Sequence, residues 1–499
     1  MSTGTVSIQI DRASEEPIYR QLIRQIRLQI ESGQLPAGTR LPASRHLAKQ
    51  VDVSRISVVN AYAELRSQGY LSAHAGRGTF VAKDINPSAG QLSNSVQHAQ
   101  EDTGKHADSS MRDMMRLSSR SGVINFSHGS PPPEFFPVAH LREALNMALD
   151  HDGASALSYE AAEGYLPLRA GVRDYVRALG IMCRTDNVLI TGGAQQGVDL
   201  VIQALVAEGQ TLITSNPTYL GVIDIARARR IQVHGIPMDE HGMRMDMLEN
   251  YLLEQKPRLI FVQPDFQNPT GQVMALHRRR QLINLANEHR VPVVEDQVYH
   301  EFRFDGESIP PLKALDDTGN IIHISAFTKM LLPGLRIGYI IADGAHHERL
   351  VRVKLAADIS TSGLNQRAMH IMMERGVLSR QLERNNRELR RRRDTALTAA
   401  ETYFPPGTRW SVPQGGLYMW VQLPRTGPTV AELFIQALQM NVAFAIGRVF
   451  HTDGCGNYHM RLNYGLQSPE NIERGFRYLG RAWREMACDY DDVAQPPIL

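Results

Sequence analysis

The sequence predicts two folded parts in one chain, an N-terminal winged helix-turn-helix of α+β type and a larger α/β domain. The first 82 residues hold three helical patterns followed by a glycine-rich hairpin pattern. Beyond residue 121, short apolar strands alternate with amphipathic helices, which is typical of a parallel sheet covered by helices on both faces. A chain of 499 residues has room for both, since it is long enough for roughly two to four domains.

The N-terminal elements follow from apolar spacing and turn residues. Residues 17–32 place apolar side chains four apart behind a proline, which predicts a first helix. A second helix is expected over 44–51 and a third over 54–68, with Asp52 and Val53 as the turn between them. Residues 70–71 and 79–81 are strand candidates on either side of 75–78, whose glycines permit a tight hairpin.

The polar face of the third predicted helix fits a DNA groove. The start of this helix would lie against base edges, and short polar and guanidinium side chains occupy it: Ser54, Arg55, Ser57 and Asn60. Arg45 on the second helix, and Arg77 with Gly78 at the hairpin tip, are placed to meet phosphates or a minor groove. Any one surface arginine is as often a plain solvated charge, but the whole set indicates binding of double-stranded DNA.

This end of the chain resembles the GntR family of bacterial regulators. The resemblance rests on residues 41–48 (LPASRHLA), 53–58 (VSRISV), 61–65 (AYAEL), 69–71 (GYL) and 76–79 (GRGT). It implies a DNA-binding domain over 1–82 that reads an operator. Asp52 replaces the usual glycine of the turn, which is a mild change because aspartate tolerates the left-handed conformation.

The rest of the chain divides into a linker, a large α/β part and a tail. Residues 83–120 are rich in polar residues and poor in large apolar ones, so we expect a flexible linker. Strands are predicted over 188–191, 210–214, 259–263, 291–295 and 321–325, and a further α+β unit over 380–488 begins with an arginine-rich helix. Residues 121–488 should form the second domain and 489–499 a tail.

Residues at the ends of these strands suit pyridoxal phosphate. This cofactor needs an amine for a Schiff base, a carboxylate at its pyridine nitrogen, donors for its phosphate and an aromatic ring to stack on. Lys329 follows a buried strand, where desolvation would lower its pKa, and Asp296 ends another strand. Either residue alone would most often be an ordinary surface residue.

Candidate phosphate donors lie on two segments. The glycine-rich turn with Gly193, Ala194 and Gln195 joins a strand to a helix, so its amides can hold a dianion. Hydroxyl and guanidinium donors follow near the lysine: Ser325, Thr328 and Arg336.

Three further residues are candidates for contacts with the cofactor ring. A turn at Asn268 could aim its amide at the phenolic oxygen, and Tyr299 could bond the same oxygen. Tyr219 can stack on the ring. Asn268 alone could mark only a β-turn, and each tyrosine alone is more often a core aromatic residue.

Residues 121–488 resemble fold type I aminotransferases of class I. The motifs occur in the family's order: 193–195 (GAQ), 217–219 (PTY), 268–271 (NPTG), 295–296 (ED), Tyr299, 325–329 (SAFTK) and 335–339 (LRIGY). The resemblance implies that Lys329 is the Schiff-base lysine, Asp296 the pyridinium partner and Arg336 a phosphate ligand.

Two further residue roles and two departures come with this resemblance. It implies that Tyr159 reaches the phosphate of a neighbouring subunit and that Arg461, in 459–464 (HMRLNY), grips the α-carboxylate of an amino acid. Gln297 stands where an acidic or small residue is frequent, and Asn216 replaces the acidic residue often found before Pro217. Both departures bear on the choice of substrate.

The combination resembles the MocR subfamily of GntR regulators. It implies a homodimer, head-to-tail, whose cofactor domains sense a ligand. The preferred hypothesis is a transcription regulator that senses an amine, amino acid or B6 vitamer through an aldimine at Lys329. Two rivals remain open: a catalytically active aminotransferase with an accessory DNA-binding domain, and an interaction module that has lost cofactor binding.

Composition excludes several other classes. Basic and acidic residues nearly balance, 54 against 52, so the whole chain is no general polyanion binder. The three cysteines have no ligand-like spacing, which predicts neither a disulfide framework nor a metal site. No apolar run approaches the roughly 20 residues of a membrane span and no signal pattern opens the chain, so a cytoplasmic protein is expected.

Overall fold

The computed structural model describes residues 8–11, 18–32, 34–67, 70–74, 78–82, 122–129 and 131–494. The chain divides into two compact units, 1–113 and 114–499, which are treated separately below. The expected linker over 83–120 and the hairpin residue Arg77 lie outside the described residues.

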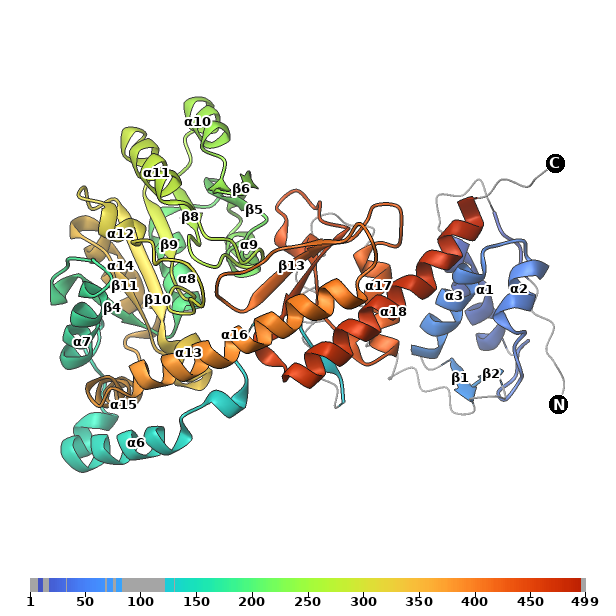
Figure 1. Ribbon diagram of the computed structural model, residues 1–499, viewed down its shortest axis with the longest axis horizontal. Coiled ribbons are helices and arrows are strands. Elements are labelled where there is room, and N and C mark those ends of the chain that lie inside the picture. Colours follow the sequence, from blue (N-terminus) through green and yellow to red (C-terminus); the bar gives the residue numbers. More distant parts are fainter. Residues whose placement is uncertain are drawn as a thin grey trace. The chain divides into compact units, whose positions relative to one another are not determined.

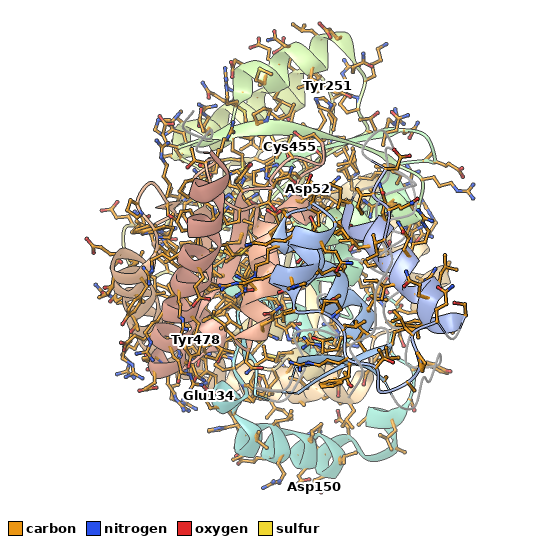
Figure 2. The ribbon with its side chains drawn as sticks, turned by 90° about the vertical axis from the view of Figure 1, so that its right-hand side faces the viewer. Asp52, Glu134, Asp150, Tyr251, Cys455 and Tyr478 are labelled. Carbon is orange, nitrogen blue, oxygen red and sulfur yellow. The ribbon has the colours of Figure 1, made fainter. Side chains whose placement is uncertain are left out.

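The first unit is a winged helix-turn-helix, as the sequence predicts. Its elements are α1 (Ile18–Glu31), α2 (Ser44–Gln50), α3 (Arg55–Ser67), β1 (Leu71–His74) and β2 (Gly78–Val81). The two strands pair antiparallel. The apolar stripe of α1 packs on the inner faces of the other helices, with Leu22, Leu47 and Leu65 fully buried. Asp52, in the turn between α2 and α3 (Figure 2), has the left-handed φ of 50° that aspartate tolerates.

The second unit is built on an eight-stranded sheet in the described part of the chain (Figure 1). The strand order is β4-β11-β10-β9-β8-β5-β6-β7. The strands are β4 (Val188–Thr191), β5 (Thr211–Asn216), β6 (Gln232–Asp239), β7 (Gly242–Met243), β8 (Leu259–Val262), β9 (Val293–Asp296), β10 (Ile321–Ala326) and β11 (Gly338–Ile341). All five strands predicted for this domain are present in it.

The sheet is mixed, whereas the sequence predicted a parallel one. Strands β5, β6, β8, β9 and β10 run parallel, but β11 pairs antiparallel with both β10 and β4. The connection from β10 to β11, residues 327–337, is too short for the crossover of a dozen or more residues that parallel neighbours require. The chain therefore turns back antiparallel.

Helices cover both faces of this sheet. Alternate residues of a strand point to opposite faces, so Val293 packs in one apolar cluster with α11 and Val294 in another with α8. The helices of this part are α6 (Val138–Asp152), α7 (Leu166–Arg177), α8 (Ala194–Leu205), α9 (Leu220–Ala228), α10 (Met245–Glu254), α11 (Leu276–Glu288), α12 (Leu312–Leu315), α13 (Phe327–Met330), α14 (Gly344–Asp358) and α15 (Gly363–Glu374).

The C-terminal α+β part contains the predicted arginine-rich helix. That helix is α16 (Val377–Tyr403), and it packs along α18 (Pro469–Ala494), which continues past residue 488 (Figure 1). A second sheet has the order β12-β13-β16-β15. The remaining elements are β12 (Arg409–Trp410), β13 (Tyr418–Gln422), α17 (Val430–Gln439), β14 (Val442–Ala443), β15 (Ala445–Ile446), β16 (His459–Asn463) and β3 (Ile124–Asn125), which pairs with β14. Among the residues placed here, no helix is long and apolar enough to cross a membrane.

Candidate functional site

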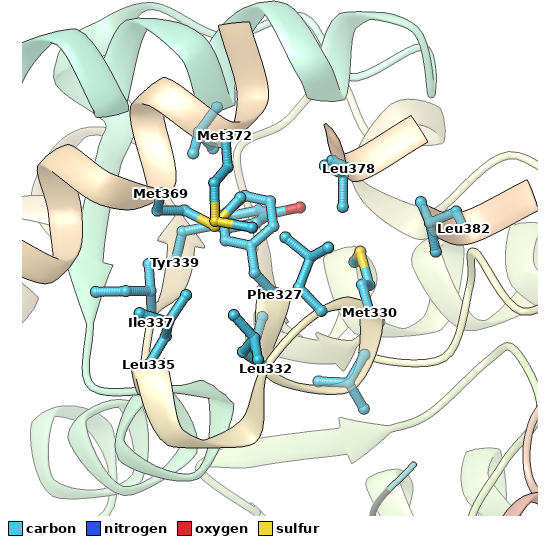
Figure 3. Packing of buried hydrophobic residues seen from close by; sticks show 14 of the residues in the cluster. Phe327, Met330, Leu332, Leu335, Ile337, Tyr339, Met369, Met372, Leu378 and Leu382 are labelled. Atoms are coloured by element: carbon cyan, nitrogen blue, oxygen red, sulfur yellow. The ribbon is translucent and has the colours of Figure 1, made fainter. Parts of the chain in front are cut away.

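Lys329 lies in a short helical turn at the carboxyl end of β10. Every residue of β10 is buried, and α13 follows it directly. Phe327 and Met330, on either side of the lysine, belong to a large apolar cluster with residues of α15 and α16 (Figure 3). This packing fixes the turn from which the lysine side chain extends. Its Nζ donates a hydrogen bond to the carbonyl of Gly129.

The electrostatic setting of Lys329 favours the neutral amine. Burial is the largest cause, and the nearby positive charges of Arg461 and Arg336 add to it, so that the pKa of Lys329 falls to about 8. A neutral amine is the form that attacks an aldehyde. The predicted lowering of this pKa therefore has two sources, desolvation and charge.

Asp296 ends the neighbouring strand β9 and is 2% exposed. It pairs in register with Ile324 of β10, which brings the two strand ends side by side. Gln263 donates to its Oδ2 at 2.8 Å and the N–H of Val298 to its Oδ1 at 3.3 Å. Burial raises the pKa of Asp296 to about 6. A cation brought to this carboxylate would stabilise its charged form.

Arg461 approaches the same region from β16. Its guanidinium donates to Asn268 Oδ1 at 2.8 Å and to the carbonyl of Ser127. It lies against two aromatic rings, with Cζ 4.3 Å from the ring centre of Tyr418 and 4.9 Å from that of Phe450. Its Nε is buried and has no hydrogen-bond partner among the described residues. A buried donor without a partner is costly, so this atom is poised for a ligand.

Tyrosine side chains surround these groups. Tyr299 and Tyr418 share a hydrogen bond of 2.9 Å between their hydroxyl oxygens. Tyr219, at the start of α9, donates to Gln195 Oε1 at 2.7 Å. Tyr418 and Gln263 were not singled out from the sequence. A tyrosine that opens an apolar strand and a glutamine that ends one carry no local pattern, and only the tertiary fold brings them here.

The glycine-rich turn and Arg336 form an anion cradle. Gly193 precedes α8 with a φ of 96°, and Ala194 and Gln195 are the first residues of that helix. Arg336 donates to the carbonyl of Gly192 at 2.8 Å. A Cβ on Gly193 would lie 2.9 Å from Arg336 Nη2, so only glycine leaves the guanidinium in this position. Amide groups at a helix N-terminus together with a guanidinium suit a phosphate.

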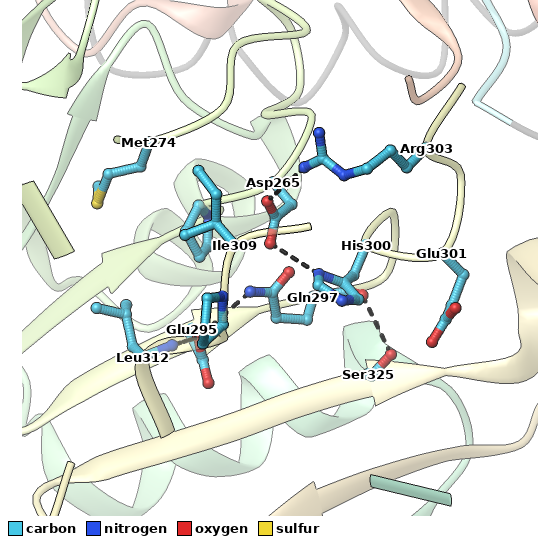
Figure 4. A network of polar contacts seen from close by, with 12 residues as sticks. Asp265, Met274, Glu295, Gln297, His300, Glu301, Arg303, Ile309, Leu312 and Ser325 are labelled. Carbon is cyan, nitrogen blue, oxygen red and sulfur yellow. Dashed lines mark hydrogen bonds and ion pairs between the residues drawn. The ribbon is translucent and has the colours of Figure 1, made fainter. Parts of the chain in front are cut away.

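The two predicted hydroxyl donors differ in their surroundings. Thr328 Oγ1 is buried, and no hydrogen-bond partner for it occurs within the described ranges. Ser325 Oγ instead donates to the carbonyl of Gln297 at 3.3 Å (Figure 4). The unpartnered Thr328 hydroxyl and the Arg336 guanidinium beside Gly193 are polar groups that suit a phosphorylated cofactor.

A buried charge network supports the segments that carry Asn268 and Tyr299. Asp265 is fully buried, receives hydrogen bonds from Arg279 at 2.6 and 3.2 Å, and contacts His300 and Arg303 (Figure 4). This network was not predictable from the sequence, because its members come from separate segments and match no motif. Since one carboxylate joins these segments, it restricts their relative movement.

Tyr159 stands apart from the other predicted residues. It follows η4 (Gly153–Leu157), and its side chain is 83% exposed. Within this one chain it does not join the Lys329 site.

In the first unit, the predicted DNA-contacting residues lie at one end of α3 and on α2. Arg45, Ser54, Arg55 and Asn60 are exposed. Ser54 Oγ accepts from the N–H of Ser57 at 3.1 Å and lies 2.9 Å from Ser57 Oγ, so this serine pair caps α3. Gly78 is the first residue of β2. The start of α3 thus presents an exposed guanidinium and amide.

Two families match the chain. Residues 121–479 match the aminotransferase class I and II family, and residues 18–81 match the gntR family of bacterial regulatory proteins. An uncharacterized HTH-type transcriptional regulator of Bacillus subtilis, YdfD, is 30% identical over 94% of this chain and 97% of its own length. The probable rhizopine catabolism regulatory protein MocR of Rhizobium meliloti is 30% identical over 76% of each chain.

A solved structure extends the match to the cofactor. The α-aminoadipate aminotransferase LysN of Thermus thermophilus, complexed with N-(5'-phosphopyridoxyl)-L-leucine, is 33% identical, covers 79% of this chain and 97% of its own, and has a TM-score of 0.71. Family membership makes pyridoxal phosphate the cofactor of the larger unit. The chain belongs to the class I and II aminotransferase family and, with its gntR-type N-terminal segment, to the MocR subfamily of transcription regulators.

Proposed function

We propose that this protein is a DNA-binding transcription regulator that binds pyridoxal phosphate at Lys329 and senses an amine, an amino acid or a B6 vitamer there. The proposal rests on one observation: the side chains of Lys329 and Arg461 lie in the same buried site. Both side chains donate hydrogen bonds to carbonyls of one short segment, Lys329 to that of Gly129 and Arg461 to that of Ser127. An amino acid requires a group that takes up its amine beside a guanidinium that binds its carboxylate. A pyridoxal aldehyde held at Lys329 would take up the amine, and Arg461 would bind the carboxylate.

Each remaining residue of the site has a role in this proposal. Pyridoxal phosphate, when bound, supplies an aldehyde and an electron-accepting ring. Asp296 would hold the pyridine nitrogen in its charged form, Asn268 and Tyr299 would bond the phenolic oxygen, and Tyr219 would stack on the ring. The phosphate would be held by Gly193, Ala194, Gln195, Ser325, Thr328 and Arg336, and by Tyr159 of a second subunit.

In this proposal, residues 1–82 form the DNA-binding domain. Residues 83–120 form a linker, 121–488 the sensing domain and 489–499 a tail. Ser54, Arg55, Ser57 and Asn60 would read base edges, while Arg45 and the hairpin with Arg77 and Gly78 would contact phosphates or a minor groove. The working form would be a cytoplasmic homodimer arranged head-to-tail. A ligand can regulate such a dimer only through unequal affinity for two of its arrangements.

A second candidate function is transamination. It is favoured by the presence in one site of a lysine with a lowered pKa, a buried carboxylate for the ring nitrogen, and Arg461. Steady turnover of an amino acid with 2-oxoglutarate, without sequence-specific DNA binding, would establish this alternative.

The test of the proposal combines cofactor and DNA measurements. After addition of pyridoxal phosphate and removal of the unbound cofactor, wild-type protein should show an absorbance band near the visible edge, and Lys329→Ala should not. Lys256→Ala, which removes an exposed lysine, is the matched control and should keep the band. A genomic DNA pull-down with the full chain, with and without the cofactor, should then enrich a defined operator. Enrichment of no sequence under either condition would contradict the proposal.

A further inference from the structure

A loop of the C-terminal part, residues 447–456, contacts the carboxyl end of β5. Asn216, the last residue of β5, donates from Nδ2 to Asp453 Oδ2 at 2.9 Å. Its Oδ1 accepts a hydrogen bond from the N–H of Thr452 at 3.2 Å. One amide thus serves as donor to a carboxylate and as acceptor from the backbone, a pair of roles that a carboxylate at residue 216 could not perform.

Neighbouring groups are shaped for this contact. A Cβ on Gly235 of β6 would lie 2.2 Å from Thr452 Oγ1 and 2.8 Å from Asn216 Cβ, so a larger residue would push the loop away. The N–H of Thr218 donates to the carbonyl of Phe450 at 2.8 Å. Three hydrogen bonds therefore join the loop to residues 216–218, and Gly235 leaves room for the loop. A chance surface contact would not explain this combination.

The loop also forms part of the Lys329 site. Phe450, at the end of η7 (Gly447–Phe450), is buried and lies against the Arg461 guanidinium. The segment of 216–219 that holds the loop also carries Tyr219. A shift of the loop away from β5 would therefore move Phe450 and remove one of the two aromatic faces that orient Arg461.

We propose that Asn216 and Asp453 form a latch that positions Phe450 against Arg461 and thereby sets the affinity of the site for the carboxylate of an amino acid. The inference rests on the proposed function only in giving Arg461 that carboxylate role. Asn216 is a positioning residue, since it acts through the loop. An aspartate at this position would remove the donor and face the Asp453 carboxylate.

The test uses Asn216→Asp, Asp453→Asn and the double variant in the full chain. The probe is N-(5'-phosphopyridoxyl)-L-leucine, and pyridoxamine phosphate, which lacks the amino-acid part, is the reference ligand. We expect Asn216→Asp to weaken binding of the conjugate about tenfold and that of the reference less than about twofold. The double variant should restore conjugate binding, because it again places one amide beside one carboxylate.

Hydrogen exchange of the peptide 447–456 provides a measurement that does not depend on the ligand. Exchange should be faster in Asn216→Asp and return to the wild-type rate in the double variant. Unchanged conjugate affinity in Asn216→Asp, or a loss that the double variant does not repair, would overturn the latch. Wild-type protein that binds the conjugate no more tightly than the reference would instead contradict the carboxylate role of Arg461, and the exchange rates would then decide the latch alone.

Discussion

The substitution Gly193→Ala tests the phosphate cradle. Gly193 has a left-handed φ of 96°, and a Cβ there would lie 2.9 Å from Arg336 Nη2 and 3.1 Å from its Cζ. The guanidinium must move, which weakens its contact with a phosphate. A charge-assisted hydrogen bond contributes about 1.5 to 3 kcal/mol, and exposure of Arg336 reduces this to about 1 to 1.5 kcal/mol.

The dissociation constant for pyridoxal phosphate should therefore rise about five- to tenfold. The assay is an absorbance titration of cofactor-free protein at constant pH. Gly209→Ala is the matched control, because Gly209 also has a positive φ of 78° but nothing lies within 4 Å of its added Cβ. Both variants place a side chain at a positive φ, so both should lose some stability from backbone strain. Equal cofactor affinity in the two variants would refute the placement of the phosphate between Gly193 and Arg336.

Three further changes test other parts of the structure. Burial and neighbouring charges lower the pKa of Lys329 from 10.5 to about 8. Cofactor uptake should therefore rise with pH and reach half its maximum near pH 8. A midpoint of uptake above about pH 10 would contradict this. Asp265→Asn leaves the buried Arg279 charge unpaired. It should lower the free energy of unfolding, measured by chemical denaturation, by about 3 to 5 kcal/mol. A loss below about 1 kcal/mol would contradict the role of the network. Arg55→Ala should weaken operator binding by about 1 to 3 kcal/mol and leave the cofactor absorbance intact. Arg66 is exposed at the far end of α3, so Arg66→Ala should leave operator binding unchanged. Equal effects of the two changes would refute the placement of the recognition helix.

Local patterns were sufficient to predict the elements of the first unit and five strands of the large sheet. Helices of the first unit are short and regularly apolar, so their bounds differ from the expected ones by only a residue or so. Strands β4 and β8 are short, mostly apolar runs that are buried throughout, a pattern typical of strands covered on both faces. Strands β6, β7 and β11 were not predicted, and the antiparallel direction of β11 depends on the length of a connection and not on the residues of the strand.

Some residues of the site were predictable from the sequence and others were not. The sequence indicates where three residues of the site gather, because each stands at or after the end of a strand: Lys329, Asp296 and Gly193. Tyr418 and the Asn216–Asp453 pair depend on contacts between residues far apart in the chain. Their geometry follows from how the C-terminal part packs on the large sheet, which no local spacing encodes.

The most direct test of the account is the operator affinity of the full chain in three states: free of cofactor, loaded with pyridoxal phosphate, and loaded in the presence of an amino acid. Fluorescence anisotropy with the operator recovered by pull-down measures it. Coupling between such sites is typically about 1 to 3 kcal/mol, so affinities should differ about five- to 150-fold between states. Identical operator affinities in all three states, with the cofactor demonstrably bound, would contradict the account.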